Sequence, residues 1–246
     1  AFEGIDRAIA NTEKNLANSC ELFESYLNFI FACKGDHWVK RKLGDVCQLE
    51  NGDRSKNYPK KKEYVKSGIP WINTGHILSD GTLSKRNMNF ITREKYNSLR
   101  TGKIQPRDLV YCLRGTLGKV ALVDPLPVGA IASSLVIIRP SKLLDSHFLY
   151  YLLRSSVGQR LIEQYSNGTA QPNLGANSVA KYTISFPDIN EQKLIVQKIA
   201  RLATETQRLE TIYQRKLQAL QELKQSLLHK AFTGELTNPT VKEVAA

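Results

Sequence analysis

Residues 191–231 read EQKLIVQKIARLATETQRLETIYQRKLQALQELKQSLLHKA, and this stretch decides the fold. Its apolar residues recur in steps of three and four, the pattern of a helix that buries one face against a partner helix. At 1.5 Å per residue such a helix is about 60 Å long, too long to bury its stripe on a compact domain of this size. We therefore expect a coiled coil, formed within the chain or with a second chain. A helix that lies across its own domain is the alternative. The stripe comprises Ile195, Ile199, Leu202, Thr206, Leu209, Tyr213, Lys216, Leu220, Leu223 and Leu227.

Capping signals mark both ends of this helix. Asp188 stands three residues before Glu191, which is the spacing of a capping box at a helix start. Gly234 is suited to end the helix, because glycine adopts the left-handed conformation found just past helix ends. His229 and Lys230 stand in the last turn, where positive charge interacts favourably with the helix dipole.

The N-terminal segment has the same periodicity, with Thr12 and Ser19 as its polar members. Its stripe begins at Phe2 with no capping residue before it, so we expect that the chain was cut inside a longer helix or that the helix begins raggedly. This helix is expected to end near Gly35, because glycine suits a position just past a helix end. The two stripes are predicted to supply a helix interface, made of Phe2, Ile5, Ile9, Leu16 and Phe23 from the first helix and Ile195, Ile199, Leu202, Leu209, Tyr213, Leu220, Leu223 and Leu227 from the second.

The sequence between the helices predicts a mixed domain. Short apolar runs at 108–113, 120–123, 135–138 and 182–186 are partly β-branched or aromatic and are bounded by Gly, Pro, Asn or Ser, as strands are. Two helices are expected among them, one around 93–99 capped by Thr92 and one around 146–165 after Asp145. We predict an α+β protein with one domain at 36–190 between long helices at 1–35 and 191–234. Residues 235–246 are expected to form a frayed tail.

The chain is strongly basic. It has 35 Lys and Arg residues against 23 Asp and Glu residues, a net charge of +12, which predicts a polyanionic partner. Its 4 cysteines form no CxxC pair and no zinc-ligand pattern, so they are expected to be reduced thiols of a cytoplasmic protein. No apolar run approaches the roughly 18 residues of a membrane span, and no signal peptide is evident. These features favour DNA or RNA over a membrane as the partner.

The densest positive run follows Gly52 and reads RSKNYPKKK at 54–62. Pro59 indicates a loop, and Lys and Arg side chains on a loop suit contacts with phosphates. A solvated loop with no ligand is the alternative. The candidate DNA-binding residues of this segment are Arg54, Lys56, Lys60, Lys61 and Lys62.

Three further segments combine amide, hydroxyl, imidazole and cationic side chains. GIPWINTGHI at 68–77 is a predicted strand end followed by a polar turn, in which Trp71 is expected in the core and asparagine could pair with adenine. RGTLGK at 114–119 has two glycines that let the backbone approach a ligand, flanked by cations. NGTAQPNLG at 167–175 is rich in amides that read bases. The alternatives are an ordinary hairpin for 114–119 and a simple connecting loop for 167–175. For Trp71, the alternative to the core is a platform on which a base stacks. The candidates are Asn73, Thr74, His76, Arg114, Thr116, Lys119, Asn167, Gln171 and Asn173.

The sequence predicts no catalytic residue, no bound metal and no cofactor. Asp188, Glu191 and Lys193 carry the letters of a PD…ExK nuclease site, but such sites place the Asp and the Glu-x-Lys on neighbouring strands around Mg²⁺, and the gap here is too short for the chain to turn. Helix capping explains the Asp and the Glu. No glycine-rich motif for S-adenosylmethionine, no NPP[YF] motif and no histidine-based triad is evident.

An ordered set of segments resembles the specificity (S) subunits of type I restriction-modification systems. The resemblance runs through ELFESYL at 21–27, WVKRKLGDV at 38–46, GIPWINT at 68–74, DLVYCLRGTLG at 108–118, GTAQPNL at 168–174 and AFTGEL at 231–236. It extends over nearly the whole chain. Such subunits have two target-recognition domains, each of which reads one half of a bipartite DNA site, separated by conserved helices that pack as an antiparallel coiled coil. This chain has one such domain.

The resemblance implies that this chain is the C-terminal half of a longer subunit or a natural half-subunit. It would read half of a bipartite DNA site and dock methyltransferase subunits, which motor-nuclease subunits join. S-adenosylmethionine, Mg²⁺ and ATP are then expected on those partner subunits only. An isolated half is expected to form a homodimer through its long helices. The alternatives left open are a coiled-coil scaffold with a basic nucleic-acid-binding domain and a Mg²⁺-dependent nuclease.

Overall fold

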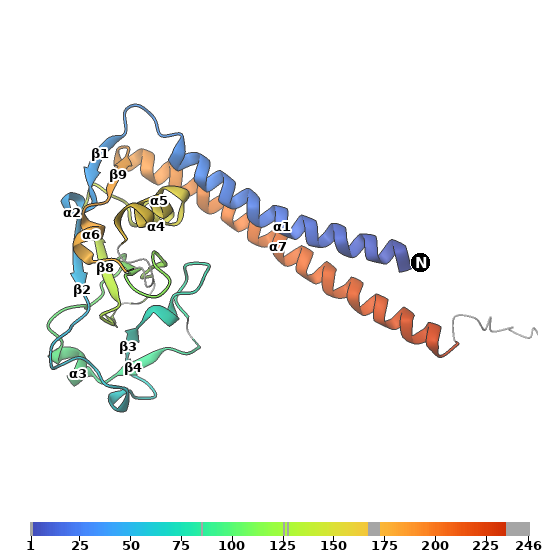
Figure 1. The fold of residues 1–246 in the computed structure, drawn as a ribbon, viewed down its shortest axis with the longest axis horizontal. Coiled ribbons are helices and arrows are strands. Elements are labelled where there is room, and N and C mark those ends of the chain that lie inside the picture. The colour runs from blue at the N-terminus through green and yellow to red at the C-terminus, as the bar shows by residue number, and fades with distance from the viewer. Residues whose placement is uncertain (1, 85, 125, 127, 167–172, 235–246) are drawn as a thin grey trace, which may run out of the picture. The chain divides into compact units, whose positions relative to one another are not determined.

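The computed structural model describes residues 2–84, 86–124, 126, 128–166 and 173–234 (Figure 1). Residues 27–198 form one compact unit, and the residues up to 26 form a second unit with those from 199 onward. Helix α1 (Phe2–Ala32) and helix α7 (Ile189–Phe232) contribute residues to both units. The fold is α+β, as predicted, with a long helix near each end of the sequence and a β-rich domain between them.

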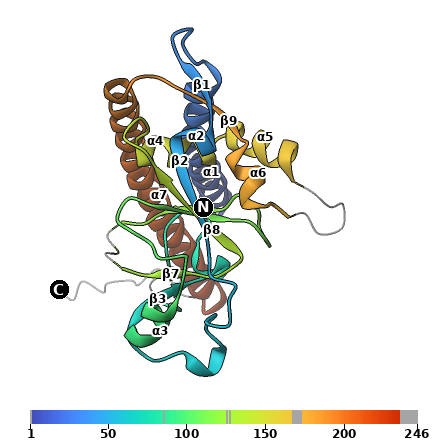
Figure 2. The same ribbon diagram turned by 90° about the vertical axis from the view of Figure 1, so that its left-hand side faces the viewer.

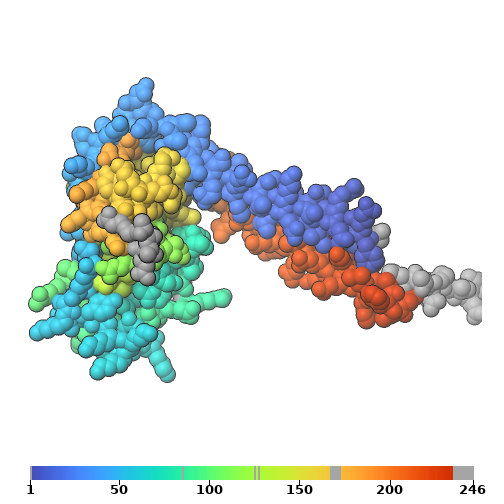
Figure 3. All heavy atoms as spheres, in the orientation of Figure 1, coloured from blue at the N-terminus to red at the C-terminus, as the bar shows by residue number. Residues whose placement is uncertain are grey.

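In the helical unit, α1 and α7 pack side by side and antiparallel (Figures 1 and 3). Two contacts define the direction: Cys20 Sγ donates to the Glu210 carboxylate at 3.1 Å, and Lys224 Nζ pairs with Asp6 Oδ1 at 2.6 Å. From the first contact to the second, the residue number falls on α1 and rises by the same amount on α7. The helices therefore run in opposite directions, and the predicted antiparallel coiled coil is confirmed.

Small polar residues occupy the buried seam of this helix pair. Thr12, Ser19 and Thr206 are buried, and small side chains allow helix axes to approach closely. The hydroxyls of Thr12 and Ser19 donate to the carbonyls four residues earlier, at 2.7 and 2.8 Å. Leu209 and Leu223 are exposed and lie outside the seam, although the heptad stripe placed them in it. The reason is that an α-helix has 3.6 residues per turn, so residues spaced seven apart shift by about 20° around the helix axis with each repeat. A row of such residues therefore gradually leaves the seam. The other predicted interface residues are buried or half-buried.

The ends of the long helices agree only in part with the capping signals. Helix α1 ends at Ala32, three residues before Gly35, near which its end was predicted, but Gly35 is not among the glycines with positive φ and so does not cap the helix. At the start of α7, Asp188 Oδ1 accepts the backbone N–H groups of Asn190 and Glu191, at 2.8 and 3.1 Å. Gly234 follows α7 with φ 77°, the left-handed conformation that was predicted there.

Among the described residues of 27–198, three sheets build the domain (Figure 2). The largest is an antiparallel sheet in the order β2 (Cys47–Asn51), β8 (Leu135–Pro140), β5 (Leu109–Cys112) and β6 (Val120–Leu122). A second sheet has the order β4 (Asn89–Ile91), β3 (Ile69–Ile72) and β7 (Ala130–Ile131). The third pairs β1 (Val39–Lys42) with β9 (Thr183–Phe186). The four runs predicted as strands correspond to β5, β6, β8 and β9.

The central strands of the largest sheet are covered on both faces. Val110 and Ile137 lie in one apolar cluster with Ile72 and Ile131 of the second sheet. On the other face, the hydroxyl of the buried Tyr111 meets that of Tyr182 at 3.3 Å. Because both faces are buried, β5 reads as an unbroken apolar run rather than an alternating one. Trp71 of β3 is also buried, so its predicted place in the core is confirmed.

The single helix predicted around 146–165 is in fact two helices, α4 (Ser146–Arg154) and α5 (Ser156–Tyr165). Ser155 separates them, because its hydroxyl accepts from the Val157 N–H at 3.2 Å and so caps α5. The predicted caps are confirmed: Asp145 accepts from the first turn of α4 and Thr92 accepts from Lys95. Thr92 caps α3 (Arg93–Ser98).

The remaining elements are short, namely α2 (Leu43–Val46), α6 (Ala176–Ala180) and the 3₁₀ turns η1 (Lys61–Glu63) and η2 (Thr74–His76). Within the described ranges, no helix is both long enough and apolar enough to cross a membrane.

Candidate nucleic-acid interface

Two arginines from distant parts of the sequence line one groove at an end of the largest sheet. Arg54 follows β2 and Arg114 follows β5, and both strands pair with β8, so their carboxyl ends lie on either side of the start of that strand. The groove has a volume of about 250 Å³ and also contains Asn51, Asn177 and the backbone around Gly175. We name these residues, Asn51, Arg54, Arg114 and Asn177, the recognition groove. Two cations and two amides around one hollow can bind phosphate and base edges together.

A buried carboxylate fixes the loop that carries Arg54. Asp53 Oδ1 accepts from the Ser55 N–H at 2.6 Å and Oδ2 accepts from the Arg100 N–H at 2.7 Å. Burial raises the pKa of Asp53, but these hydrogen bonds outweigh burial and bring its pKa below the ordinary value. Asn57 Nδ2 adds a bond to the Ser98 carbonyl at 2.7 Å. The backbone of the loop is thus held while the exposed Arg54 side chain reaches the groove.

The lysines of the same segment lie outside the recognition groove. Lys60, Lys61 and Lys62 are exposed on and just before η1, and Lys56 is exposed on the preceding loop. Glu63 accepts from the Lys60 N–H and pairs with Lys95, both at 2.8 Å, which holds this turn against α3. In the part of the chain that the structure describes, none of the four predicted lysines has an ion-pair partner, so all four are available to phosphates.

The hairpin between β5 and β6 presents Arg114 and Thr116 to solvent, whereas Lys119 is half-buried. Gly118 has φ 76°, and a Cβ added there would stand 2.0 Å from Ile162 Cδ1. Gly115 also has a positive φ, of 79°, but has open space around it. The second glycine is therefore required by packing against α5, and the first by backbone conformation alone. The hairpin also meets the segment before α6, because Leu174 N–H donates to the Leu113 carbonyl at 3.0 Å.

The segment after β3 uses its polar groups internally. Asn73 Oδ1 accepts from the Gly75 N–H at 2.9 Å, and the Asn73 N–H donates to His76 Nδ1 at 3.0 Å. His76 Nε2 donates to the Asn87 carbonyl at 2.9 Å, and His76 is only 4% exposed. Burial lowers the pKa of His76, which keeps it neutral with the proton on Nε2. Of these candidates, Asn73 and Thr74 are half-buried, and His76 belongs to the core of the turn rather than to an exposed surface.

The amide-rich loop is only partly described. Asn167 and Gln171 lie outside the described residues, and Asn173 is exposed three residues before α6. Sequence reasoning missed Asn51 and Asn177, since a lone asparagine at a strand end or in a short helix carries no pattern. Only the tertiary fold brings Asn51, at the end of β2, and Asn177, in α6, beside Arg54 and Arg114.

The suspected nuclease residues take structural roles. Asp188 caps α7, and the Glu191 carboxylate binds His37 Nε2 at 2.8 Å and Trp38 Nε1 at 3.2 Å. Glu191 thus ties the start of α7 to the segment before β1 instead of completing a capping box. Among the described residues, no group of three His, Cys, Asp or Glu side chains is placed to hold a metal ion.

A basic β-rich domain with a groove of arginine and asparagine, in one chain with an antiparallel helix pair, defines a nucleic-acid-recognition protein. The family described as "Type I restriction modification DNA specificity domain" matches residues 35–219, and the chain belongs to this family. Specificity subunits are the non-catalytic subunits of these systems.

Relatives and solved structures agree with this assignment. The chain is 28% identical over 174 residues to the EcoBI specificity subunit of Escherichia coli, covering 70% of this chain and 36% of the relative. It is 26% identical over 210 residues to the EcoKI specificity subunit of E. coli K12, covering 81% and 43%. The chain thus spans less than half the length of these relatives.

Two solved chains share the fold, each at 18% identity. One comes from a study of complex assembly and conformational transition of the type I R-M system, with a TM-score of 0.77 over 94% of this chain and 56% of the other. The second is the HsdS subunit from Thermoanaerobacter tengcongensis, with a TM-score of 0.67 over 94% and 55%.

Proposed function

We propose that this chain reads one half of a bipartite DNA site and presents that site to methyltransferase subunits of a type I restriction-modification complex. The observation that carries the proposal is the recognition groove, in which Arg54 and Arg114 stand with Asn51 and Asn177. The net charge of +12 supplies the affinity for phosphates that does not depend on sequence. The amides supply hydrogen bonds that distinguish bases, adenine above all.

In this proposal, the other subunits of the complex carry out the methylation and the cleavage of DNA. Methyltransferase subunits would bind S-adenosylmethionine, and motor-nuclease subunits would bind ATP and Mg²⁺. This chain would act in the cytoplasm and bind double-stranded DNA and those subunits. It would need no cofactor of its own, because its role is to grip the DNA beside the base that the methyltransferase flips out of the helix.

A homodimer would supply the second half of the bipartite site. Helix α7 carries a second apolar row outside the seam with α1, formed by the exposed Leu209, Ile212 and Leu223. Steps of three and eleven residues place these side chains on one side of the helix. Two copies that bury this row against each other would have two identical recognition domains, as a full subunit has two different ones. A strictly monomeric sedimentation profile at micromolar concentration would count against the dimer.

The experiment that tests this proposal measures both the binding of DNA by this chain and the methylation of DNA by the complex. The chain is expressed with the methyltransferase subunit from the same system, and methylated sites are mapped on random DNA. We expect adenine methylation in a bipartite motif, symmetric if two copies act together. Arg54→Ala combined with Arg114→Ala should weaken specific DNA binding about tenfold or more and lower the slope of log Kd against log salt by up to about two, one for each phosphate contact.

Arg215→Ala is the control, since it removes one exposed cation from the helical unit and should leave DNA affinity nearly unchanged. Equal losses in the control and the double variant would show that the groove is not the reading surface. Preference for RNA, or no binding of nucleic acid, would support the scaffold alternative. Mg²⁺-dependent cleavage by the purified chain would support the nuclease.

A further inference from the structure

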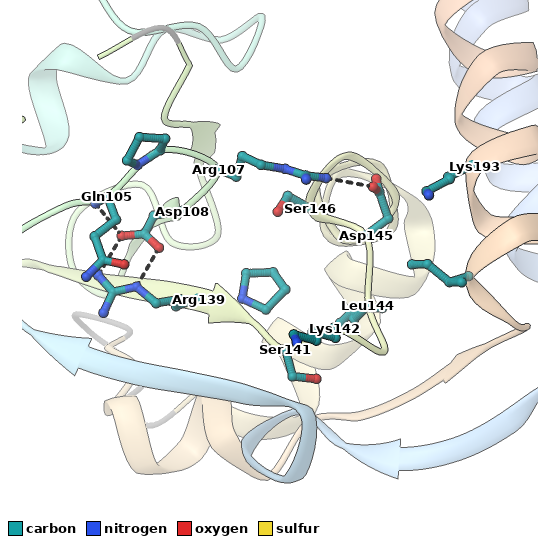
Figure 4. A pocket seen from close by; sticks show the side chains of 13 residues that line it. Gln105, Arg107, Asp108, Arg139, Ser141, Lys142, Leu144, Asp145, Ser146 and Lys193 are labelled. Atoms are coloured by element: carbon teal, nitrogen blue, oxygen red, sulfur yellow. Dashed lines mark hydrogen bonds and ion pairs between the residues drawn. The ribbon is translucent and has the colours of Figure 1, made fainter. Parts of the chain in front are cut away.

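A polar basin of about 370 Å³ opens at the end of the largest sheet opposite the recognition groove (Figure 4). It is formed by the 105–108 turn before β5, the end of β8, the 141–146 segment and the first turns of α7. In the sheet register, Leu109 and Pro140 lie at this end, whereas Cys112 and Leu135 lie at the groove end. The basin is therefore a separate site, and the proposed DNA contacts do not account for it.

Arg107 stands in the basin with a backbone conformation that disfavours its side chain. Its φ is 70°, and among the described residues it is the one non-glycine with positive φ. It follows Pro106 in a turn closed by the Asp108 N–H donating to the Gln105 carbonyl at 3.2 Å, a place where glycine is the easier residue. The guanidinium reaches Asp145 Oδ2 at 3.1 Å, but the Arg107 side chain is 63% exposed, so this pair adds little stability. Folding alone does not explain an arginine here, whereas an anionic ligand does.

Among the described residues, the charges of the basin leave two lysines without an ion-pair partner. Asp108 is matched by Arg139, which donates two hydrogen bonds to it at 2.8 Å. Asp145 caps α4 with one oxygen and meets Arg107 with the other. Lys142 and Lys193 are exposed, and neither has an ion pair in the part of the chain that the structure describes. Figure 4 shows Arg107 and Lys193 on either side of the Asp145 carboxylate, so a negative group in the basin would meet cations from two sides.

An exposed leucine follows each of these lysines in the sequence, although neither leucine is among the residues that line the basin. Leu143 is 63% exposed, and Leu194 is 57% exposed. The buried Gln192 holds the two segments together, since its Nε2 donates to the Leu143 carbonyl at 2.9 Å and its Oε1 accepts from the Asp145 N–H at 2.8 Å. A DNA backbone offers nothing to exposed leucines. A protein segment with both carboxylates and apolar side chains matches the whole surface.

We infer that the basin docks an acidic segment of a protein partner, whose carboxylates bind Arg107, Lys142 and Lys193 and whose apolar side chains cover Leu143 and Leu194. The identity of the partner rests on the proposed function, which makes it the methyltransferase subunit. The site is preformed, because the turn before β5 is fixed by Asp108 and the start of α7 by Gln192. Docking would then fill a rigid surface and order few residues of this chain.

Arg107→Gly separates docking from stability. Glycine fits the turn better than arginine, so the melting temperature should stay within a few degrees of the wild type. Its complex with the methyltransferase subunit, measured by sedimentation or fluorescence anisotropy, should be at least tenfold weaker. Lys193→Glu should weaken the complex further by charge reversal, and both variants should bind DNA as the wild type does. Lys66→Glu makes the same charge reversal on an exposed residue away from the basin and should leave the complex intact.

Each other outcome overturns the inference. If Arg107→Gly and Lys193→Glu form the complex as tightly as Lys66→Glu, the partner docks elsewhere and the proposed DNA reading still stands. If instead these variants lose DNA affinity with a shallower salt dependence, the basin contacts phosphates and not a protein. If the wild-type chain binds its DNA but forms no complex, both this docking site and the docking part of the proposed function fall.

Discussion

Replacing Gln192 by leucine should remove three hydrogen bonds at once, two of them buried and one partly buried. Gln192 is 0% exposed, and each polar atom of its amide binds backbone: Oε1 accepts from the Asp145 N–H at 2.8 Å, and Nε2 donates to the carbonyls of Leu143 at 2.9 Å and Pro187 at 2.8 Å. These bonds join the start of α7 to the segment that leads into α4. Leucine has a similar volume but offers none of them.

The loss in the free energy of unfolding can be estimated from the backbone groups that the substitution leaves without a hydrogen-bond partner. A buried backbone group that loses its partner costs about 1–3 kcal/mol; two such groups are left here, and the partly buried Leu143 carbonyl adds a smaller cost. Burial of the leucine side chain returns about 1.5–3 kcal/mol. The net loss in the free energy of unfolding should be about 3 kcal/mol, a large part of the stability of an ordinary domain. Gln192→Glu should be comparably harmful near neutral pH, because it places a carboxylate oxygen against two carbonyl oxygens.

Urea denaturation followed by tryptophan fluorescence measures this loss, since Trp71 is buried in the same domain. Gln197→Leu is the matched control, because it makes the same exchange on the same helix at an exposed position. It should change stability by less than about 0.5 kcal/mol. If Gln192→Leu and Gln197→Leu are equally stable, the amide does not hold these segments together. The rigidity argued for the docking basin would then fail as well.

Two further predictions concern titration and thiol reactivity. The pKa of His76 is lowered in the fold, so on acidification the unfolded chain takes up a proton first and stability falls, by up to about 1.4 kcal/mol per pH unit below about pH 6.5. His76→Gln should flatten this slope in urea melts between pH 7.5 and 5.5, and an unchanged slope would exclude His76 as its source. A thiol reagent should label Cys20 and Cys33 in the native protein, but Cys47 and Cys112 only on unfolding, because burial raises the pKa of both to about 12. Native labelling of either buried thiol would refute this.

The sequence predicted the two long helices and the strands β5, β6, β8 and β9, because their signals are local; β2, β4 and β7 were not predicted. The stripes that begin at Phe2 and Ile195 predicted a coiled coil, and the helices do pack together, although Leu209 and Leu223 lie outside the seam. Asp145, Asp188 and Thr92 were correctly predicted as caps, since a cap depends on residues within one helical turn.

Other boundaries could not be predicted, for identifiable reasons. Gly35 does not end α1, because the chain leaves the helix at Ala32 without the left-handed residue that favours glycine. Ser155 divides one apolar pattern into two helices through a side-chain cap, and serine in a helical pattern carries no such signal. Within β1, all four residues are exposed, so no apolar alternation marked it as a strand.

The candidate site shows the same division between local and long-range information. Arg54 and Arg114 were predicted separately, but their meeting depends on the pairing of β2 and β5 with the same strand. His76 was a candidate because histidine can bind DNA, yet its ring is fully used by Asn73 and Asn87. Residue type therefore predicts what a side chain can bind, and only the turn around it determines whether the side chain is free to do so.

In the recognition groove, the residues that hold the loops in place are different from the residues that would read DNA. Two residues support the groove: the buried Asp53 holds the loop of Arg54, and the half-buried Gly118 allows the hairpin of Arg114 to pack against α5. The side chains of Asn51, Arg114 and Asn177 are exposed and make no hydrogen bond within the described residues. Exchanging them should alter the DNA sequence preferred while leaving the fold unchanged, because surface substitutions rarely change stability by more than about 0.5 kcal/mol. A specificity protein needs this arrangement, since its target can then change without a new fold.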